Sequence, residues 1–414
     1  MIILYKLLIN IVFFISPLIV IFRIIKRKED IKRVKEKFCF FSKNRGIGKI
    51  IWFHGASVGE LQSIVPLLEK LETNNKVKKI LITSNTLSSS KIIQKFKSKK
   101  IIHQFFPIDT NFLSKKFINY WKPSLAVFID SEIWPNMLIN LKQKNIPTIL
   151  LNGRITKKTL KRWNIFPKFA KKIFSKFDLC LSSSNVSKEY LIKLGAKKVR
   201  YIGNLKFSQS EYEKVSIPNK LKKFLNSKKT WCASSTHLSE ESFCGAVHKE
   251  LKLKYKNLLT IIIPRHIDRS QAIGKELSKL DLKIQFDSSI SKIDPKTDIY
   301  IVNSYGKTKS FYNVCQNVFL GGSLIKHGGQ NPLEATRYGC KVIHGPNISN
   351  FTEIYQLLKK EKISIEIKNQ KQMINALNYF FLKNRNTQKS KKHLKFLGKQ
   401  ILNKTYKEIN TIIK

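Results

Sequence analysis

The sequence predicts an α/β protein with two Rossmann-like domains. From residue 49 onward, short apolar segments alternate with amphipathic helical segments, a pattern typical of parallel sheets wound with helices. A polar, Lys-rich stretch with Pro218, residues 208–228, divides these segments into two series. Two similar halves joined by one linker predict a ligand site where the carboxyl ends of strands from both halves converge.

Each series supplies a set of expected strands. In the first half they are Lys49–His54, Lys79–Thr83, Leu125–Ile129, Thr148–Asn152, Leu179–Ser182 and Val199–Ile202. In the second half they are Lys229–Ala233, Leu258–Ile263, Ile299–Asn303, Asn317–Leu320 and Lys341–His344. We therefore expect an N-terminal Rossmann-like domain over residues 49–208, a C-terminal one over 209–385, and a closing helix over 386–414.

The N-terminal segment predicts a membrane anchor. Residues 7–25 are almost continuously apolar, and a cluster of Lys and Arg follows from Arg23 to Lys37. A cleavable signal peptide would carry its charge before the apolar run. We therefore assign residues 1–25 to an anchor and 26–48 to a basic juxtamembrane segment, with the body in the cytoplasm. Pro17 and the short run leave an interfacial helix open as the alternative.

Composition narrows the function classes. The 414 residues carry 78 Lys+Arg against 27 Asp+Glu, a net charge of +51, so polyanionic partners or a background bias toward Lys are both open readings. With 42% hydrophobic residues the chain is too apolar for a disordered basic tail. The six cysteines form no C-x-x-C pair, which predicts reduced thiols and a cytosolic compartment.

Polar residues follow several expected strands of the first half. HGASVGE at 54–60 joins a strand to a helix expected over Leu61–Leu71, so Glu60 either complements the helix dipole or takes a proton from an incoming hydroxyl. DSEIWP at 130–135 places two carboxylates, Asp130 and Glu132, beyond another strand. Arg154 and Lys206 follow two further strands, where cations suit an anionic ligand.

The second half carries a candidate phosphate site. PRH at 264–266 ends one strand, GGS at 321–323 ends another, and HGGQNPLE at 327–334 opens a helix near Asn331 and Pro332. Glu334 is placed to accept from ribose hydroxyls. The sequence has no Walker A loop, H-E-x-x-H, G-x-S-x-G or D-x-D pattern, so we expect no metal and no other cofactor, with phosphate charge met by Arg, Lys and helix dipoles.

These motifs together resemble one family, the bacterial 3-deoxy-D-manno-octulosonic acid (Kdo) transferases of lipopolysaccharide assembly. The matching stretches run in family order: HGASVGE at 54–60, DSEIWPN at 130–136, LNGRIT at 151–156, GNLKF at 203–207, ASSTH at 233–237, PRHIDR at 264–269, GGSLIKHGGQNPLEA at 321–335 and GPNISNF at 345–351.

The resemblance implies a glycosyltransferase of the B-type fold that moves Kdo from CMP-Kdo to a hydroxyl of the phosphorylated lipid A precursor, lipid IVA, with inversion. It implies that Glu60 is the general base and that Glu132 and Lys206 stabilise the transition state. The residues implied to hold CMP are Pro264, Arg265, Tyr305, Gly306, Lys307, Asn331, Pro332, Leu333 and Glu334.

Two departures stand out against the family pattern. Tyr305-Gly306-Lys307 replaces a usual Met-Gly-Glu, and SNTLSSS at 84–90 replaces a Thr-Pro-Thr-Gly run. The first puts any carboxylate role at 307 in doubt, and the second points to different acceptor contacts.

The expected location is the cytoplasmic face of the bacterial inner membrane, whose anionic surface the basic segment would contact. Two alternatives remain at this point. A basic nucleic-acid-binding protein is motivated only by the charge, and no nucleic-acid motif is present. A B-type glycosyltransferase with another nucleotide sugar is the second.

Overall fold

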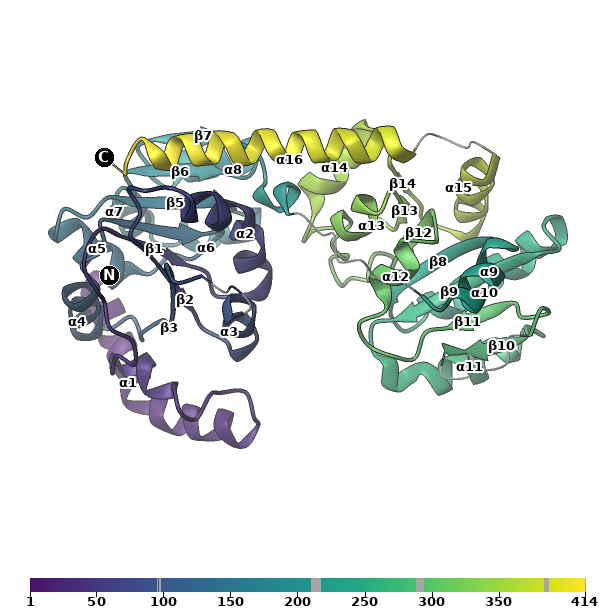
Figure 1. Ribbon diagram of the computed structural model, residues 1–414, viewed down its shortest axis with the longest axis horizontal. Helices are drawn as coiled ribbons and strands as arrows, with labels where there is room; N and C mark the ends of the chain where they lie inside the picture. The colour runs from purple at the N-terminus through teal and green to yellow at the C-terminus, as the bar shows by residue number, and fades with distance from the viewer. Residues whose placement is uncertain (95, 97, 210–216, 288–293, 383–386, 414) are drawn as a thin grey trace. The chain divides into compact units, whose positions relative to one another are not determined.

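The computed structural model describes residues 1–94, 96, 98–209, 217–287, 294–382 and 387–413. The chain forms two compact units, one of residues 1–210 with 397–414 and the other of residues 211–396. Each contains one sheet with helices, as Figure 1 shows. The predicted fold class of two parallel-sheet α/β domains is confirmed.

The sheet of unit 1 has seven strands in the order β3-β2-β1-β4-β5-β6-β7, and neighbouring strands are parallel. The strands are β1 (Ile50–His54), β2 (Lys79–Ser84), β3 (Ile101–Phe105), β4 (Leu125–Ile129), β5 (Thr148–Gly153), β6 (Leu179–Ser182) and β7 (Val199–Tyr201). The helices are α1 (Ile2–Ile25), η1 (Val34–Phe38), α2 (Val58–Glu72), α3 (Leu87–Gln94), α4 (Asn111–Trp121), α5 (Pro135–Gln143), α6 (Lys157–Trp163), α7 (Pro167–Phe174), α8 (Asn185–Lys193) and η2 (Leu205–Ser208).

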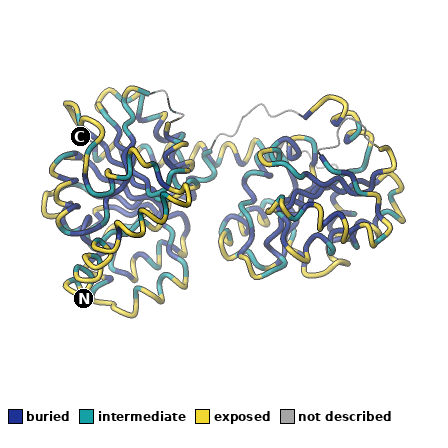
Figure 2. Tube along the Cα trace, turned by 90° about the horizontal axis from the view of Figure 1, so that it is seen from below, coloured by how far each residue is buried: buried dark blue, intermediate teal, exposed yellow. Residues whose placement is uncertain are grey.

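Successive strand residues of unit 1 bury opposite faces of this sheet, because side chains alternate along a strand. Trp52 and Phe128 pack with α4, α5 and α7 on one face, whereas Phe53 and Val127 pack with α2 on the other. The end of α16 (Thr387–Asn410) covers this second face through Ile401 and Ile409. Figure 2 shows the buried residues concentrated in the sheets.

The sheet of unit 2 has the order β10-β11-β9-β8-β12-β13-β14, again parallel throughout. Its strands are β8 (Lys229–Thr236), β9 (Leu258–Pro264), β10 (Ile284–Phe286), β11 (Ile299–Ile301), β12 (Asn317–Leu320), β13 (Lys341–His344) and β14 (Ser364–Glu366). Its helices are α9 (Asn219–Asn226), α10 (Glu240–Lys254), η3 (Ile267–Arg269), α11 (Ser270–Ser278), α12 (Thr308–Tyr312), α13 (Leu333–Arg337), α14 (Thr352–Lys360) and α15 (Gln370–Leu382).

Both sheets have a topological switch point, where the chain reverses the direction in which it adds strands. In unit 1 it lies between β1 and β4, and in unit 2 between β8 and β12. Open α/β sheets bind ligands just beyond the carboxyl ends of the strands at such a point. Residues 54–60 and 130–132 therefore occupy the expected binding position in unit 1, and residues 237–240 and 321–323 do so in unit 2.

Several expected boundaries differ from the structure. The strand predicted over Val199–Ile202 ends at Tyr201, and the one predicted over Ile299–Asn303 ends at Ile301. Three strands were not predicted: β3, β10 and β14, all at or next to a sheet edge. The stretch 208–228, predicted as a linker leading into a helix, contains α9, and its residues 210–216 lie outside the described residues.

Candidate active site

Glu60 lies in the first turn of α2, directly after β1. Its Oε2 accepts hydrogen bonds from the backbone N–H of Ala56 at 2.7 Å and of Ser57 at 3.3 Å. Ser57 Oγ in turn accepts from the Glu60 N–H, which completes a capping box. Helix capping therefore accounts for the local geometry of Glu60 and fixes its side chain at the carboxyl end of β1.

Glu132 lies beyond the end of β4, the strand paired with β1, and one of its carboxylate oxygens has two hydrogen-bond partners. Trp134 Nε1 donates to Glu132 Oε2 at 2.8 Å, and Nε2 of His54 lies 3.1 Å from that atom. His54 is fully buried, and its ring stacks on Phe106. A rigid aromatic surround thus holds the Glu132 carboxylate in one position.

Electrostatics separates the two glutamates. Burial, followed by the negative charge of Glu132, raises the pKa of Glu60 from 4.5 to about 7. Burial also acts to raise the pKa of Glu132, but the hydrogen bonds from His54 and Trp134 outweigh it and lower that pKa below its ordinary value. Two neighbouring carboxyl groups whose pKa values differ are the usual arrangement in which one group acts as a base and the other stays ionised.

Cationic side chains complete the site of unit 1. Lys206 Nζ lies 3.6 Å from Asp130 Oδ2. Burial raises the pKa of Asp130 above its ordinary value, although the charges of Lys206 and Arg154 act to lower it. Asn152 Oδ1 accepts from the Leu205 N–H at 2.9 Å, which ties the Lys206 segment to the end of β5. The structure thus brings Glu60, Glu132 and Lys206, predicted from separate motifs, to one edge of one sheet.

The predicted donor-binding residues lie at the carboxyl ends of two strands, β9 and β11, and at the start of one helix, α13, of unit 2. Pro264 ends β9 and is buried, while the exposed Arg265 donates its backbone N–H to Thr236 O at 3.0 Å. Tyr305 is 76% exposed, and Gly306 takes a left-handed backbone with φ of 83°. These residues lie on the β9 and β11 sides of the sheet.

Lys307, where the family usually has a glutamate, pairs with a carboxylate of this chain. Lys307 Nζ forms an ion pair with Asp287, whose carboxylate also accepts from Tyr300 Oη at 2.9 Å and Ser304 Oγ at 2.8 Å. A lysine at this position therefore neutralises a buried carboxylate instead of supplying one.

The segment Asn331–Glu334 forms the start of α13. Asn331 Oδ1 accepts from the Leu333 N–H at 3.1 Å, Pro332 and Leu333 are buried, and Glu334 is half-buried. The helix has only five residues, so its dipole is small and a phosphate here would depend mainly on individual N–H groups and cations.

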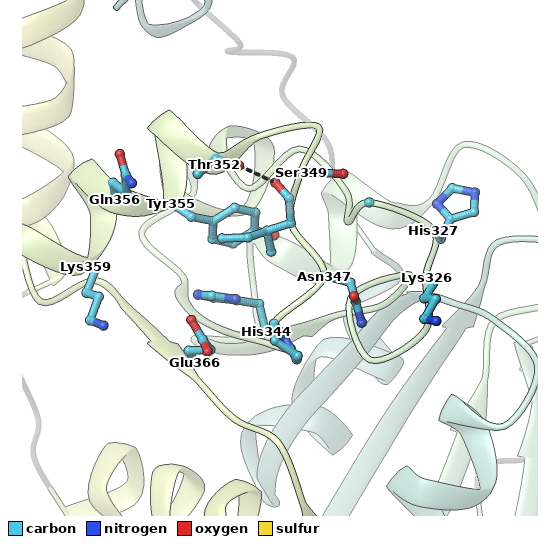
Figure 3. A pocket seen from close by; sticks show the side chains of 13 residues that line it. Lys326, His327, His344, Asn347, Ser349, Thr352, Tyr355, Gln356, Lys359 and Glu366 are labelled. Carbon is cyan, nitrogen blue, oxygen red and sulfur yellow. Dashed lines mark hydrogen bonds between the residues drawn. The ribbon is translucent and has the colours of Figure 1, made fainter. Parts of the chain in front are cut away.

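A pocket of about 630 Å³ in unit 2 was not predicted from the sequence. It lies beyond the ends of β13 and β14, and Figure 3 shows His344, Glu366, Lys359, Asn347 and His327 around it. None of the predicted site residues lines it. The signal that could have located it is the GPNISNF motif, because residues 346–349 form one side.

Among the described residues, no group of three or more His, Cys, Asp or Glu side chains is arranged to hold a metal ion. All six cysteines are buried free thiols, and burial raises the pKa of Cys180, Cys232 and Cys244 well above its ordinary value.

Comparison with known proteins decides the family. Residues 32–209 match the family model "3-Deoxy-D-manno-octulosonic-acid transferase (kdotransferase)". A 3-deoxy-D-manno-octulosonic acid transferase from Rickettsia bellii is 32% identical over 365 residues, covering 87% of this chain and 86% of the relative. The chain belongs to the Kdo transferase family.

A second relative agrees with this assignment, and a solved structure agrees with the fold. A Kdo transferase from Haemophilus influenzae is 28% identical over 321 residues, covering 77% of this chain and 75% of that protein. The crystal structure of a glycosyltransferase from Rickettsia africae superposes with a TM-score of 0.57 at 14% identity, covering 89% of this chain and all of that one. This Kdo transferase family member is thus an enzyme, a glycosyltransferase with the B-type fold, as its sequence predicted.

Proposed function

We propose that this chain transfers Kdo from CMP-Kdo to a hydroxyl of the phosphorylated lipid A precursor, lipid IVA, in lipopolysaccharide biosynthesis. The observation that carries the chemical part is the divided pair of carboxyl groups, Glu60 with a pKa of about 7 and Glu132 with a lowered one. Family membership supports the donor and the transferred sugar.

Glu60 is the general base in this proposal. Its ionised carboxylate takes the proton of the acceptor hydroxyl as the acceptor oxygen attacks the anomeric carbon of Kdo. The bond from that carbon to the CMP phosphate breaks, CMP leaves with the electron pair, and the configuration inverts. A base with a pKa near the working pH combines a sizeable ionised fraction with useful proton affinity.

Glu132 and Lys206 stabilise the transition state. Glu132 remains charged because His54 and Trp134 donate to it. Its negative charge stabilises the positive charge that develops on the sugar ring in the transition state. Lys206, held near Asp130, offers a cation to developing negative charge.

We assign the CMP moiety to unit 2. Arg265 meets phosphate charge, and the Tyr305–Lys307 turn and Asn331–Glu334 surround the nucleoside. This chemistry requires no metal, because a monophosphate leaving group needs less charge neutralisation than a diphosphate, and the cation and N–H groups here supply it.

The N-terminal helix supports a membrane location. Among the described residues, α1 is the one helix long and apolar enough to cross a membrane, and 6% of its most apolar window is buried. Its least exposed positions form one stripe of helical spacing: Ile2, Tyr5, Lys6, Ile9, Phe13, Ser16, Val20, Arg23 and Ile24. The remaining faces carry exposed Leu, Ile and Phe side chains.

Contacts at both ends of α1 favour an in-plane orientation. Tyr5 Oη donates to Asp109 at 2.8 Å near the start, and Arg23 pairs with Glu29, which Lys37 also contacts, near the end. The Tyr5 contact holds the start of α1 against a distant part of unit 1, which favours a helix that lies along the membrane surface over one that crosses the bilayer. We propose that α1 lies in the cytoplasmic leaflet, with the basic segment 26–48 against anionic headgroups.

The decisive experiment incubates the purified full chain with CMP-Kdo and lipid IVA and measures Kdo-bearing lipid by mass. Glu60→Gln is expected to lower turnover at least a thousand-fold with CMP affinity unchanged. Glu69→Gln, an exposed glutamate on the same helix, is the matched control with full activity. Absence of product from folded wild-type enzyme would refute the proposed reaction, and an active Glu60→Gln variant would refute only the base.

The orientation of α1 has its own test. A cysteine at Ile3, which is 75% exposed, is expected to resist a membrane-impermeant thiol reagent added from the periplasmic side of intact cells. The six native cysteines are buried and give a low background. Labelling from the periplasm would show that α1 spans the bilayer.

A further inference from the structure

The switch point of unit 2 is built around the ends of β8 and β12. The two strands are paired with Leu320, the last residue of β12, opposite Ser234, and β8 continues to Thr236. His237 follows β8, and Gly321 and Gly322 follow β12. A methyl group at Gly321 would stand 2.4 Å from Ser235 O, so the two backbones approach as closely as only glycine permits.

Glu240 fixes the backbone of this junction. Its carboxylate is 1% exposed and accepts four main-chain N–H groups, from His237 at 3.0 Å, Gly322 at 2.7 Å, Ser323 at 3.1 Å and Leu324 at 3.0 Å. These bonds satisfy the carboxylate and hold the turn after β12 against the start of α10. The site is therefore preorganised before any ligand binds.

His237 carries an unused hydrogen-bonding atom at this junction. The residue is 9% exposed, and its Nε2 has no hydrogen-bond partner among the described residues. A methyl group at Gly322 would stand 3.3 Å from Nε2, and the exposed ring of His327 covers it with 4.4 Å between ring centroids. Buried polar atoms without partners are uncommon in folded proteins, and ligand-binding sites are one place where they occur.

Basic side chains from two segments, residues 265–269 and residue 327, act on the same ring. Burial, followed by the charges of His327, His266, Arg265 and Arg269, lowers the pKa of His237 to about 4. The acidic groups packed here are already engaged, since Glu240 accepts four N–H groups and Glu241 pairs with Arg269. The neutral His237 ring, surrounded by basic side chains, can therefore donate a hydrogen bond to an anion.

We propose that Nε2 of His237 binds an anionic oxygen of the donor substrate at this junction, with the ring of His327 displaced on binding. The inference rests on the proposed function, because CMP-Kdo supplies two such groups, the phosphate of CMP and the carboxylate of the sugar acid. His237 is thus a donor-binding residue in addition to those predicted from the sequence.

The test compares CMP with CMP-Kdo by calorimetry on the full chain in detergent. Asparagine is too short to reach the Nε2 position, whereas glutamine places an amide N–H near it. We expect His237→Asn to weaken CMP-Kdo at least ten-fold and His237→Gln to restore most of that loss. The matched control is His393→Asn, whose side chain is half-exposed on α16.

The two ligands identify the anion. Equal weakening of CMP and CMP-Kdo assigns His237 to the phosphate, and weakening of CMP-Kdo alone assigns it to the carboxylate. Unchanged affinity of folded His237→Asn for both overturns the inference and leaves the proposed function standing. If the wild-type chain binds neither ligand, the proposed function fails and the inference fails with it.

A measurement on the wild-type chain covers the case in which the variants do not fold. With ¹³C-histidine labelling, the His237 imidazole is identified by its ring contact with His327 and told apart from His103, whose pKa burial lowers to about 3. The His237 ring is expected to titrate at least one pH unit higher when CMP-Kdo is bound. A bound anion stabilises the protonated ring, so binding also strengthens as the pH falls through the raised pKa of the bound state toward about 4. An unchanged titration of that ring would overturn the inference.

Discussion

Nε2 of His54 lies 3.1 Å from Oε2 of Glu132, while Nδ1 of the same ring lies 2.9 Å from Oγ1 of Thr83. Trp52 Nε1 donates to that hydroxyl at 2.9 Å, and the hydroxyl in turn has Phe53 O at 3.4 Å as an acceptor. With a proton on Nε2, the His54 ring donates to Glu132 Oε2. Buried hydrogen bonds that involve residues of β1 and β2 thus help to keep Glu132 ionised. Glu60 is left as the carboxyl group that titrates near neutrality.

The first prediction concerns pH. If ionised Glu60 is the base, kcat/KM is expected to rise ten-fold per pH unit below about pH 7 and to level off above it, because burial and the charge of Glu132 raise its pKa to about 7. A steady-state profile between pH 5 and 9 measures this. A rate independent of pH across 6 to 8 would contradict it.

The same pKa has a consequence for stability. The folded carboxyl of Glu60 keeps its proton above the ordinary pKa of 4.5, so stability falls as the pH rises from about 4.5 to 7. Glu60→Gln, which still accepts the capping hydrogen bonds, should therefore raise the melting temperature at pH 8 by about 2–4 °C. At pH 4 the difference should vanish. Glu69→Gln should change neither value by a comparable amount.

The second prediction tests the fixed charge. Trp134→Phe removes the 2.8 Å hydrogen bond to Glu132 but keeps an aromatic ring against His54 and Phe106. Since that bond helps to lower the pKa of Glu132, we expect kcat to fall about ten-fold, the cost of one charge-assisted bond. KM for CMP-Kdo should stay unchanged. Trp163→Phe on α6 is the control, and an unaltered kcat would exclude this role of Trp134.

The strands that could be predicted from the sequence are those with a clear pattern of apolar residues. The central strands were predicted within one to three residues because both faces of a wound parallel sheet are buried, which gives uniform apolar runs such as Leu125–Ile129. The strands β3, β10 and β14, which were not predicted, all lie at sheet edges, and β10 and β14 have three residues each and so carry a short pattern.

The candidate site shows the same division. Glu60, Glu132 and Lys206 follow strands with clear turn signals, so their residue types and positions were evident. The role of Glu240 was not, because its meaning depends on four N–H groups, three of them more than 80 residues away along the chain. The pairing of Lys307 with Asp287 is equally invisible in a linear pattern.

The third prediction concerns the hydrogen bond between Tyr5 of α1 and Asp109, whose carboxylate also contacts the start of α5. Tyr5 Oη donates to Asp109, whose carboxylate also accepts the N–H groups of Asn136 at 3.0 Å and Met137 at 2.8 Å, at the start of α5. Burial raises the pKa of Asp109 to about 7, although these hydrogen bonds lower it. Above pH 7 Asp109 is therefore a buried carboxylate that depends on its three donors.

Tyr5→Phe should destabilise the full chain by about 1–2 kcal/mol at pH 8, since hydrogen bonds to charged groups contribute more than neutral ones. The loss should be smaller at pH 5, where folded Asp109 is protonated. Thermal unfolding in detergent at the two pH values measures it. Tyr201→Phe, at a half-exposed side chain, is the control. An equal loss at both pH values would contradict the ionisation of Asp109.

The fourth prediction concerns the metal requirement. Because we assign the charge of the departing phosphate to Arg265 and neighbouring N–H groups, EDTA at millimolar concentration should leave initial rates of Kdo transfer within two-fold of the untreated enzyme. Arg265→Gln should lower CMP affinity about ten-fold or more, and added Mg²⁺ should not restore it. Loss of activity in EDTA with recovery on Mg²⁺ would refute the assignment.

The last prediction links α16 to the active site. A methyl group at Gly398 would stand 2.3 Å from Phe207 O, and that carbonyl follows Lys206 directly in η2. Backbone cannot yield as a side chain can, so Gly398→Ala should displace η2 and cost about 1–3 kcal/mol in the free energy of unfolding. Because Lys206 moves with η2, kcat should fall more than KM for CMP-Kdo rises. Lys399→Ala, exposed at the next position of α16, should change neither kcat nor stability appreciably. If Gly398→Ala is destabilised with an unchanged kcat, the contact is structural only and Lys206 is not positioned through it.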